Sequence, residues 1–157
     1  MLKTHLSKHL TIALVAHDQR KADMVEWAAF NATTLAAHKL VCTGTTGSLI
    51  RKAFDDDGVK AEIICLNSGP LGGDAEIAAM VVRHEVNLAI FLIDDLNPQP
   101  HEADIQMLLR QCRIHNVPIA CNRYSADLMI TSTLWDDATY IPTVPKYTRF
   151  VRENQPA

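Results

Sequence analysis

The sequence lacks the features that would point to a membrane, to secretion or to nucleic acid. None of its apolar runs reaches the length of a membrane-spanning helix, and residues 1–10 alternate between polar and apolar side chains, unlike an export signal. The formal net charge of the 157 residues is −3, and the Lys and Arg residues are scattered, so no basic face is predicted. We therefore expect no membrane partner, no nucleic-acid partner and a cytoplasmic location.

Cysteine is also scarce, and the spacings typical of metal sites are absent. The four cysteines, Cys42, Cys65, Cys112 and Cys121, lie in apolar stretches without CxxC spacing and are too sparse for a disulfide scaffold. We expect them to be reduced core residues. No HExxH or other compact ligand pattern occurs, so no metal ion is expected. Ser68 lacks the GxSxG elbow of a serine nucleophile.

The remaining composition is that of an ordinary folded protein, with 48% hydrophobic and 21% charged residues. A chain of this length is close to the commonest size of a single domain, so we expect one domain over residues 1–157. From about residue 140 the chain carries two prolines and then Lys146, Arg149 and Arg152. This composition predicts a basic tail over 140–157 that is extended at first and ends in a short helix.

Five short apolar runs alternate with segments long enough for a crossover helix, and such runs are typical of strands covered on both faces. The runs lie at residues 11–16, 39–42, 61–66, 88–93 and 118–121. Apolar residues recur at helical spacing within 77–82 and 105–112. Further helices are expected after Asp18, from the turn at 43–47 and near Ser125, which can cap a helix start. The pattern predicts an α/β fold with a doubly wound, mostly parallel five-stranded sheet and helices on both faces, a Rossmann-like three-layer arrangement.

A polar cluster follows each predicted strand. Because the carboxyl ends of parallel strands lie at one edge of a sheet, we expect the five clusters to meet on one rim, where such folds bind ligands. The clusters are 17–18, 43–47, 68–74, 94–104 and 122–127.

The cluster TGTTG at 43–47 resembles a phosphate cradle. Its glycines let the backbone approach an anion, and its hydroxyls and helix N–H groups can bind phosphate oxygens. The GxxxxGK[ST] spacing of the nucleotide P-loop is absent. Lys21, one turn after His17, could pair with the same phosphate. Alternatively, the turn at 43–47 only caps a helix. His17 could likewise be hydrogen-bonded scaffolding, and Lys21 a solvated surface lysine.

Three residues could move protons. A Gly-Pro-x-Gly-Gly turn precedes Asp74 at a predicted helix start, where a carboxylate can serve as a general base or, alternatively, only as a helix cap. His101 and Asp104 are three residues apart and are predicted to project from one helix face, as a proton shuttle requires. Alternatively, His101 is only an exposed cap residue, and Asp104 is a first-turn acid that interacts favourably with the helix dipole.

Taken in order and with their spacing, IALVAHD, TGTTG, SGPLGGD and the stretch from Asp94 to Asp104 followed by LLR resemble the methylglyoxal synthase family over residues 11–147. The resemblance implies a doubly wound α/β domain that assembles as a homohexamer. It also implies a lyase without a cofactor that converts dihydroxyacetone phosphate to methylglyoxal and inorganic phosphate through an ene-diolate. Phosphate is commonly an inhibitor or allosteric ligand in this family.

The resemblance also implies roles for individual residues. Asp74 would be the base, His101 and Asp104 would assist proton movements, and His101 would help to stabilise the enolate oxygen. The residues that would hold substrate or phosphate are His17, Lys21, Thr43, Gly44, Thr45, Thr46, Ser68 and Gly69. Asp18 and Asp94 would support the site, and Arg110 of the LLR motif would be a candidate for a salt bridge.

Some positions depart from the family. Asp95 stands where the family has proline, and Ile93 where it has tryptophan. Arg123 and Tyr124 stand where the family has smaller residues. These departures are expected to crowd and charge the rim. The alternative function is a non-catalytic regulatory module that senses phosphate esters, because similar domains are regulatory parts of carbamoyl phosphate synthetase. The combination of Asp74, His101 and Asp104 favours the lyase, because a sensor has no chemical need for all three.

Overall fold

The computed structural model of the chain describes residues 8–147 and contains a five-stranded sheet. Its strands are β1 (Thr11–Ala16), β2 (Lys39–Thr43), β3 (Glu62–Leu66), β4 (Leu88–Leu92) and β5 (Ile119–Ala120). They pair in the order β3-β2-β1-β4-β5, and every pairing is parallel. The predicted doubly wound sheet is confirmed, and it is fully rather than mostly parallel.

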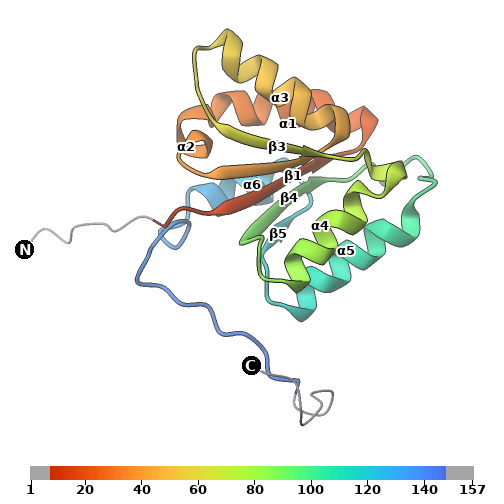
Figure 1. Cartoon of the computed structure of the whole chain (residues 1–157), viewed down its shortest axis with the longest axis vertical. Coiled ribbons are helices and arrows are strands. Elements are labelled where there is room, and N and C mark those ends of the chain that lie inside the picture. Colours follow the sequence, from red (N-terminus) through yellow and green to blue (C-terminus); the bar gives the residue numbers. More distant parts are fainter. Residues whose placement is uncertain (1–7, 148–157) are drawn as a thin grey trace, which may run out of the picture.

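Helices cover both faces of the sheet, and Figure 1 shows α1 and α3 on one side with α4 and α5 on the other. The first face packs against α1 (Lys21–Phe30), α2 (Ala32–Ala36), α3 (Gly44–Asp56) and α6 (Arg123–Ile130), and the second against α4 (Gly73–Val82) and α5 (Glu102–Ile114). Two 3-10 turns, η1 (Asp18–Arg20) and η2 (Gly69–Leu71), lead into α1 and α4. The expected three-layer arrangement is therefore present.

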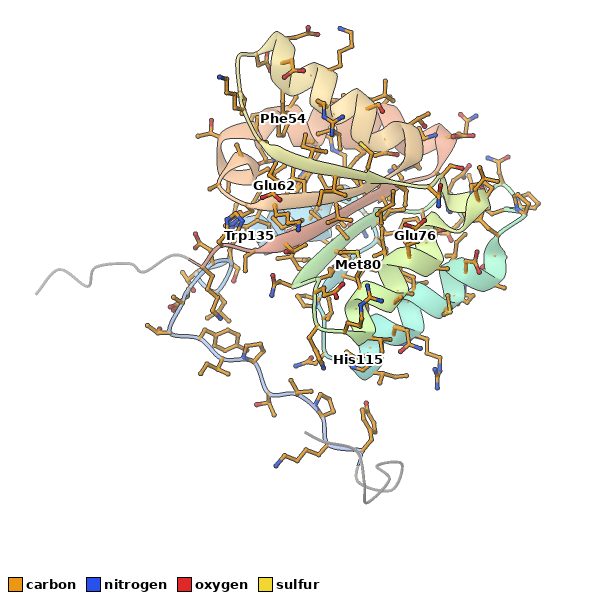
Figure 2. All side chains as sticks on the ribbon, in the orientation of Figure 1. Phe54, Glu62, Glu76, Met80, His115 and Trp135 are labelled. Atoms are coloured by element: carbon orange, nitrogen blue, oxygen red, sulfur yellow. The ribbon has the colours of Figure 1, made fainter. Side chains whose placement is uncertain are left out.

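The strands send alternate side chains into two apolar cores. Leu14 of β1 belongs to the core that contains Trp27 and Phe54, and its neighbour Val15 belongs to the core that contains Ile77. Figure 2 shows side chains filling the space between the helices and the sheet on both faces. Burying a side chain of this size stabilises the fold by about 1.5–3 kcal/mol. Because both faces are buried, the central strands are continuous apolar runs rather than alternating ones.

The structure differs from the sequence-based expectation at one helix start and contains one short helix that was not expected. Helix α6 starts at Arg123 after the N-cap Asn122, whose side-chain oxygen accepts the Ser125 backbone N–H at 2.8 Å. Ser125 therefore donates to the cap and is not the cap itself, which corrects the prediction. The sequence pattern does not predict α2, because five residues are too few to show a helical period.

Two cysteines are exposed, which corrects the expectation that all four lie in the core. Cys42 and Cys112 are buried, whereas Cys65 and Cys121 are exposed, and all four are free thiols. Cys65 lies on β3, which is an edge strand, and Cys121 follows β5, which is the opposite edge. An edge strand has a neighbour on one side alone, so an apolar sequence there does not ensure burial.

The start of the predicted tail forms neither helix nor strand. Residues 140–147 are exposed, and Figure 1 shows this segment leading away from the sheet. The expected basic helix with Arg149 and Arg152 lies outside the described residues. Within residues 8–147, none of the helices combines the length and the apolar character needed to cross a bilayer.

A buried histidine at the amino edge of the sheet makes the stability of the fold dependent on pH. His38 is 2% exposed, and its Nδ1 accepts the Leu10 backbone N–H at 3.1 Å. Burial lowers the pKa of His38 below its ordinary value of 6.5. The unfolded chain therefore binds this proton more readily than the folded chain, so stability is fully present above about pH 6.5 and is lost as the pH falls towards the folded pKa.

We expect the free energy of unfolding, measured by urea denaturation, to decrease between about pH 7.5 and about pH 5.5. In His38→Asn, whose side-chain oxygen can still accept the Leu10 N–H, the decrease should be smaller. It should not vanish, because burial also lowers the pKa of His17. An identical decrease in the two proteins would show that His38 does not titrate in this range.

Candidate active site

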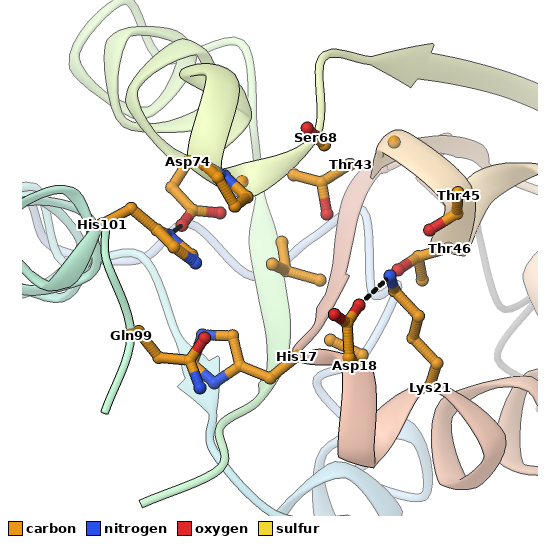
Figure 3. Close-up of a pocket in the computed structure, with 15 residues that line it drawn as sticks. His17, Asp18, Lys21, Thr43, Thr45, Thr46, Ser68, Asp74, Gln99 and His101 are labelled. Carbon is orange, nitrogen blue, oxygen red and sulfur yellow. Dashed lines mark hydrogen bonds and ion pairs between the residues drawn. The ribbon is translucent and has the colours of Figure 1, made fainter. Parts of the chain in front are cut away.

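The loops that follow β1 to β4 enclose a cavity of about 300 Å³ at the carboxyl edge of the sheet. Figure 3 shows polar side chains from separate loops converging on it. The cavity is lined by Val15, Ala16, His17, Asp18, Lys21, Thr43, Gly44, Thr45, Thr46, Ser68, Gly69, Pro70, Asp74, Gln99 and His101. This volume is at the lower end of the range for ligand pockets and suits a small metabolite.

The cavity gathers most of the residues singled out in the sequence. All the residues expected to hold substrate line it, together with Asp74, His101 and Asp18, whereas Asp94, Asp104 and Arg110 do not. The cluster at 122–127 does not line it either, although we expected all five clusters to meet. It follows β5, which β4 separates from β1 at the edge of the sheet.

The start of α3 forms one end of the cavity. Thr43 is the N-cap residue, and its side chain makes no capping hydrogen bond. The Gly44 N–H donates to the Asn67 carbonyl at 3.1 Å, so the N–H groups of Thr45 and Thr46 remain available to an anion. Gly44 has a φ of +39°, and a Cβ there would lie 2.8 Å from the Ser68 Cα, so this close approach of two loops requires glycine. Thr46 Oγ1 is buried without a hydrogen-bond partner. Amide and hydroxyl donors thus face the space that a phosphate would occupy.

Lys21 brings a positive charge to the same end of the cavity. Its ammonium group pairs with the Asp18 carboxylate, as the dashed line in Figure 3 marks. This hydrogen bond lowers the pKa of Asp18. The ion pair holds the lysine near Thr45 and Thr46, which line the same cavity.

A buried carboxylate and an imidazole form the other end. Asp74 lies in the first turn of α4, and its Oδ2 is 2.6 Å from Nδ1 of His101, the N-cap residue of α5. The partner of His101 is therefore Asp74, not Asp104 as the spacing of three residues predicted. Because His101 precedes the helix, it does not share a helix face with Asp104. Asp74 Oδ1 is buried and has no protein partner.

The surroundings of Asp74 increase its basicity. Burial raises the pKa of Asp74, the hydrogen bond from His101 opposes that rise, and the negative charge of Asp104 adds to it. A carboxylate with a raised pKa, one oxygen held and the other free is suited to remove a proton from carbon.

His17 presents a neutral N–H group to the cavity. Its Nδ1 accepts the Asp94 backbone N–H at 2.9 Å, so the proton of the neutral ring is on Nε2. Burial lowers the pKa of His17, and the nearby His101 lowers it further. Nε2 is buried and has no protein partner. The ring can therefore donate a hydrogen bond to a substrate oxygen at neutral pH.

Gln99 also lines the cavity, and it belongs to the cluster at 94–104, but no role was predicted for its side chain. Its side-chain N–H donates to the Asn97 carbonyl at 3.2 Å, and Figure 3 shows Gln99 at the same end of the cavity as His101. Its position depends on the path of the loop between β4 and α5, which residue spacing does not reveal.

Gly73 brings α4 against the loop after β3, and we expect its replacement to be strongly destabilising. A Cβ on Gly73 would lie 2.1 Å from the Asn67 carbonyl oxygen, which is a backbone atom that cannot turn aside. Gly73→Ala should lower the free energy of unfolding by about 3 kcal/mol or more in urea denaturation.

The control is Gly58→Ala, where a Cβ meets nothing within 4 Å but φ is +69°. In this variant the free energy of unfolding should decrease by about 1–2 kcal/mol, from backbone strain alone. A smaller loss at Gly73 than at Gly58 would contradict the contact with Asn67.

The donors in the cavity suit phosphate and proton transfer. Hydroxyls, helix N–H groups and one ammonium group bind phosphate oxygens, and a carboxylate with two imidazoles can move protons. Among residues 8–147, no group of three or more His, Cys, Asp or Glu side chains is arranged to hold a metal ion.

Comparisons with known proteins identify the family. Residues 23–121 match the MGS-like domain. The chain is 66% identical over 148 residues to methylglyoxal synthase of Treponema socranskii, with 94% of each protein covered. It is 41% identical over 137 residues to methylglyoxal synthase of Pseudoalteromonas atlantica, with 87% of this chain and 98% of the relative covered. The crystal structure of methylglyoxal synthase from Elizabethkingia anophelis matches with a TM-score of 0.81 at 37% identity, covering 96% of this chain and 95% of the other. The chain therefore belongs to the methylglyoxal synthase family.

Proposed function

We propose that the protein converts dihydroxyacetone phosphate to methylglyoxal and inorganic phosphate. The observation that carries this proposal is the set of buried, unpartnered atoms in one cavity, which comprises His17 Nε2, Thr46 Oγ1 and Asp74 Oδ1. Leaving such an atom unpaired costs about 1–3 kcal/mol, so a ligand that supplies partners is expected. The three atoms match a substrate with a phosphate at one end and a carbonyl beside an acidic C–H at the other.

The first step forms the ene-diolate. With the phosphate at the start of α3, Asp74 Oδ1 removes a proton from the hydroxymethyl carbon, and the electron pair moves towards the carbonyl oxygen. The His17 Nε2–H group donates a hydrogen bond to that oxygen as its negative charge develops. The tautomer of His17 supports this role, because Nδ1 is already occupied by the Asp94 N–H.

The second step expels phosphate. His101 keeps its proton on Nδ1, where it hydrogen-bonds to Oδ2 of Asp74, so its Nε2 can accept the proton of the substrate hydroxyl. The electron pair left on that oxygen forms the aldehyde, the double bond shifts, and the C–O bond to phosphate breaks. That bond must lie out of the ene-diolate plane. The resulting enolate takes the proton held by Asp74 on its terminal carbon and becomes methylglyoxal, and the proton held by His101 leaves with the phosphate.

Lys21, Thr45, Thr46 and the first-turn amides of α3 would hold the phosphate as it leaves and meet its charge. Thr43, Gly44, Ser68 and Gly69 would shape the walls around it. A metal ion has no role in this scheme.

Asp18, Asp94 and Asp104 would support the site by positioning or tuning other residues, without contacting the substrate. Asp18 holds Lys21, the Asp94 backbone sets the His17 tautomer, and the charge of Asp104 raises the pKa of Asp74. Arg110 is exposed and has no ion pair with a carboxylate among residues 8–147, so its expected salt bridge is not formed there.

The proposal includes a cytoplasmic homohexamer that inorganic phosphate inhibits. Free phosphate would compete for the cradle that binds the phosphate of the substrate. Exposed apolar side chains support assembly, with Leu96 at 92% and Phe30 at 89% exposure. Free cysteine thiols are consistent with a reducing compartment.

The test is release of methylglyoxal and phosphate from dihydroxyacetone phosphate by the purified protein in the presence of a chelator. We expect one methylglyoxal for each phosphate, without added metal. Binding of the substrate without any release would instead indicate a phosphate-ester sensor. Activity that disappears on chelation and returns with a divalent metal would contradict the metal-free scheme.

A further inference from the structure

Cys42 and Cys65 have no part in the proposed chemistry, yet they lie beside the loops that build the phosphate cradle. They are register partners on the adjacent parallel strands β2 and β3. Neighbouring strands are about 4.8 Å apart, and a disulfide joins Cα atoms that are about 4.4–6.8 Å apart. The backbone spacing of this pair therefore suits a disulfide.

Both side chains also point to the same small space beneath α3. A Cβ placed on Gly47 would lie 2.6 Å from Cys65 Sγ and 2.9 Å from Cys42 Cβ. Both cysteines thus contact the bare Cα of Gly47, on one face of the sheet. No side chain from Gly47 enters the space they share.

The two thiols differ in their access to reagents. Cys65 is exposed, whereas Cys42 is 0% exposed. Burial raises the pKa of the Cys42 thiol to about 12, and the neighbouring Cys65 adds to the rise. A reagent should therefore react first at Cys65, and Cys42 should react afterwards, from inside the protein.

We propose that Cys42 and Cys65 are a dithiol modification site, which a low-molecular-weight disulfide oxidises to an intramolecular disulfide that inactivates the enzyme. The Cys65 thiolate attacks one sulfur of the reagent, its S–S bond breaks, and one thiolate leaves. The Cys42 thiolate then attacks the Cys65 sulfur and displaces the second thiolate. The two cysteine protons end on the two released thiols, so the chain loses two electrons and the reagent gains them.

Inactivation follows from the position of the pair. A disulfide draws Cβ atoms to about 3.8 Å, which is closer than the spacing of parallel strands. Thr43 follows Cys42 directly, and Ser68 is three residues after Cys65, so the movement would reach two residues of the cavity wall. A displacement of about 1 Å can lower a rate by about 10²-fold. This consequence for activity rests on the proposed lyase function.

The experiment treats the whole protein with glutathione disulfide, blocks free thiols with an alkylating reagent, and measures intact mass, peptide cross-links and lyase activity. We expect a Cys42–Cys65 cross-link with the loss of two hydrogen atoms, and a decrease in kcat/KM of about tenfold or more. Dithiothreitol should restore both the mass and the activity. Because Cys42 has a raised pKa, the cross-link should form faster at higher pH.

Two variants separate this pair from the other exposed cysteine. Cys65→Ser should form no cross-link and should keep its activity during treatment, whereas Cys121→Ser should behave like the wild type. A mixed disulfide at Cys65 that never closes, or a cross-link that leaves activity unchanged, would overturn the proposal. If the untreated protein has no lyase activity, the proposed function fails, but the mass measurement still decides whether the disulfide forms.

Discussion

Replacing Asp74 with asparagine is expected to lower kcat for methylglyoxal formation by about 10³-fold or more, while phosphate affinity stays within a few fold. The amide would keep the size of the side chain but could not accept a proton from carbon. The cradle at the other end of the cavity, with Thr46 and Lys21, would be unchanged. Initial-rate kinetics and calorimetric titration with inorganic phosphate would measure the two quantities separately.

A matched control lies in the same turn of α4. Glu76→Gln makes the same chemical change at a carboxylate outside the cavity, and the new amide oxygen can still accept the Asn67 side-chain N–H that Glu76 accepts at 2.6 Å. This variant should retain nearly full activity. Equal decreases of kcat in the two variants would mean that turnover needs the negative charge at the start of α4, rather than a carboxylate base in the cavity. Loss of phosphate binding in Asp74→Asn would indicate misfolding.

Substitution of His17 should separate its structural bond from its chemical one. His17→Asn keeps an oxygen near the position of Nδ1, which can accept the Asp94 N–H, but it has no group that reaches the position of Nε2. We expect kcat to decrease by about 10²–10³-fold, as for loss of one oxyanion donor, with little change in the free energy of unfolding.

The complementary variant is His17→Gln. Its amide can donate a hydrogen bond near the position of Nε2, but the Asp94 N–H loses its acceptor. We expect this variant to retain more activity than His17→Asn and to be less stable by about 1–3 kcal/mol in urea denaturation. The reverse order, with His17→Asn active and His17→Gln inactive, would show that His17 acts as scaffolding and not as the donor to the enolate oxygen.

Much of the fold could be predicted from the sequence because strands buried on both faces are continuous apolar runs. The expected segments at 11–16 and 39–42 correspond to β1 and β2, and the turn at 43–47 begins α3 as expected. Residues of the site that belong to strand ends could be predicted for the same reason. His17, Thr43 and Ser68 each follow or end a strand whose carboxyl end had to face one rim.

Predictions that depended on the surroundings of a residue were less successful. Cys65 is part of an apolar run, but β3 is at the edge of the sheet and leaves the thiol exposed. The cluster at 122–127 follows a strand, but β5 lies too far along the sheet to reach the cavity. Gln99 enters the cavity from a loop whose path has no periodic pattern.

The sequence by itself determined the parallel α/β class, the rim on which polar residues gather and the family to which they belong. These properties depend on local spacing, which sets how side chains alternate along a strand or recur along a helix. Only the tertiary structure decided that His101 pairs with Asp74 rather than Asp104, and that the Asp94 backbone fixes the proton of His17 on Nε2. Those partners lie 27 and 77 residues apart in the chain, and such contacts depend on which strands become neighbours, which no local spacing records.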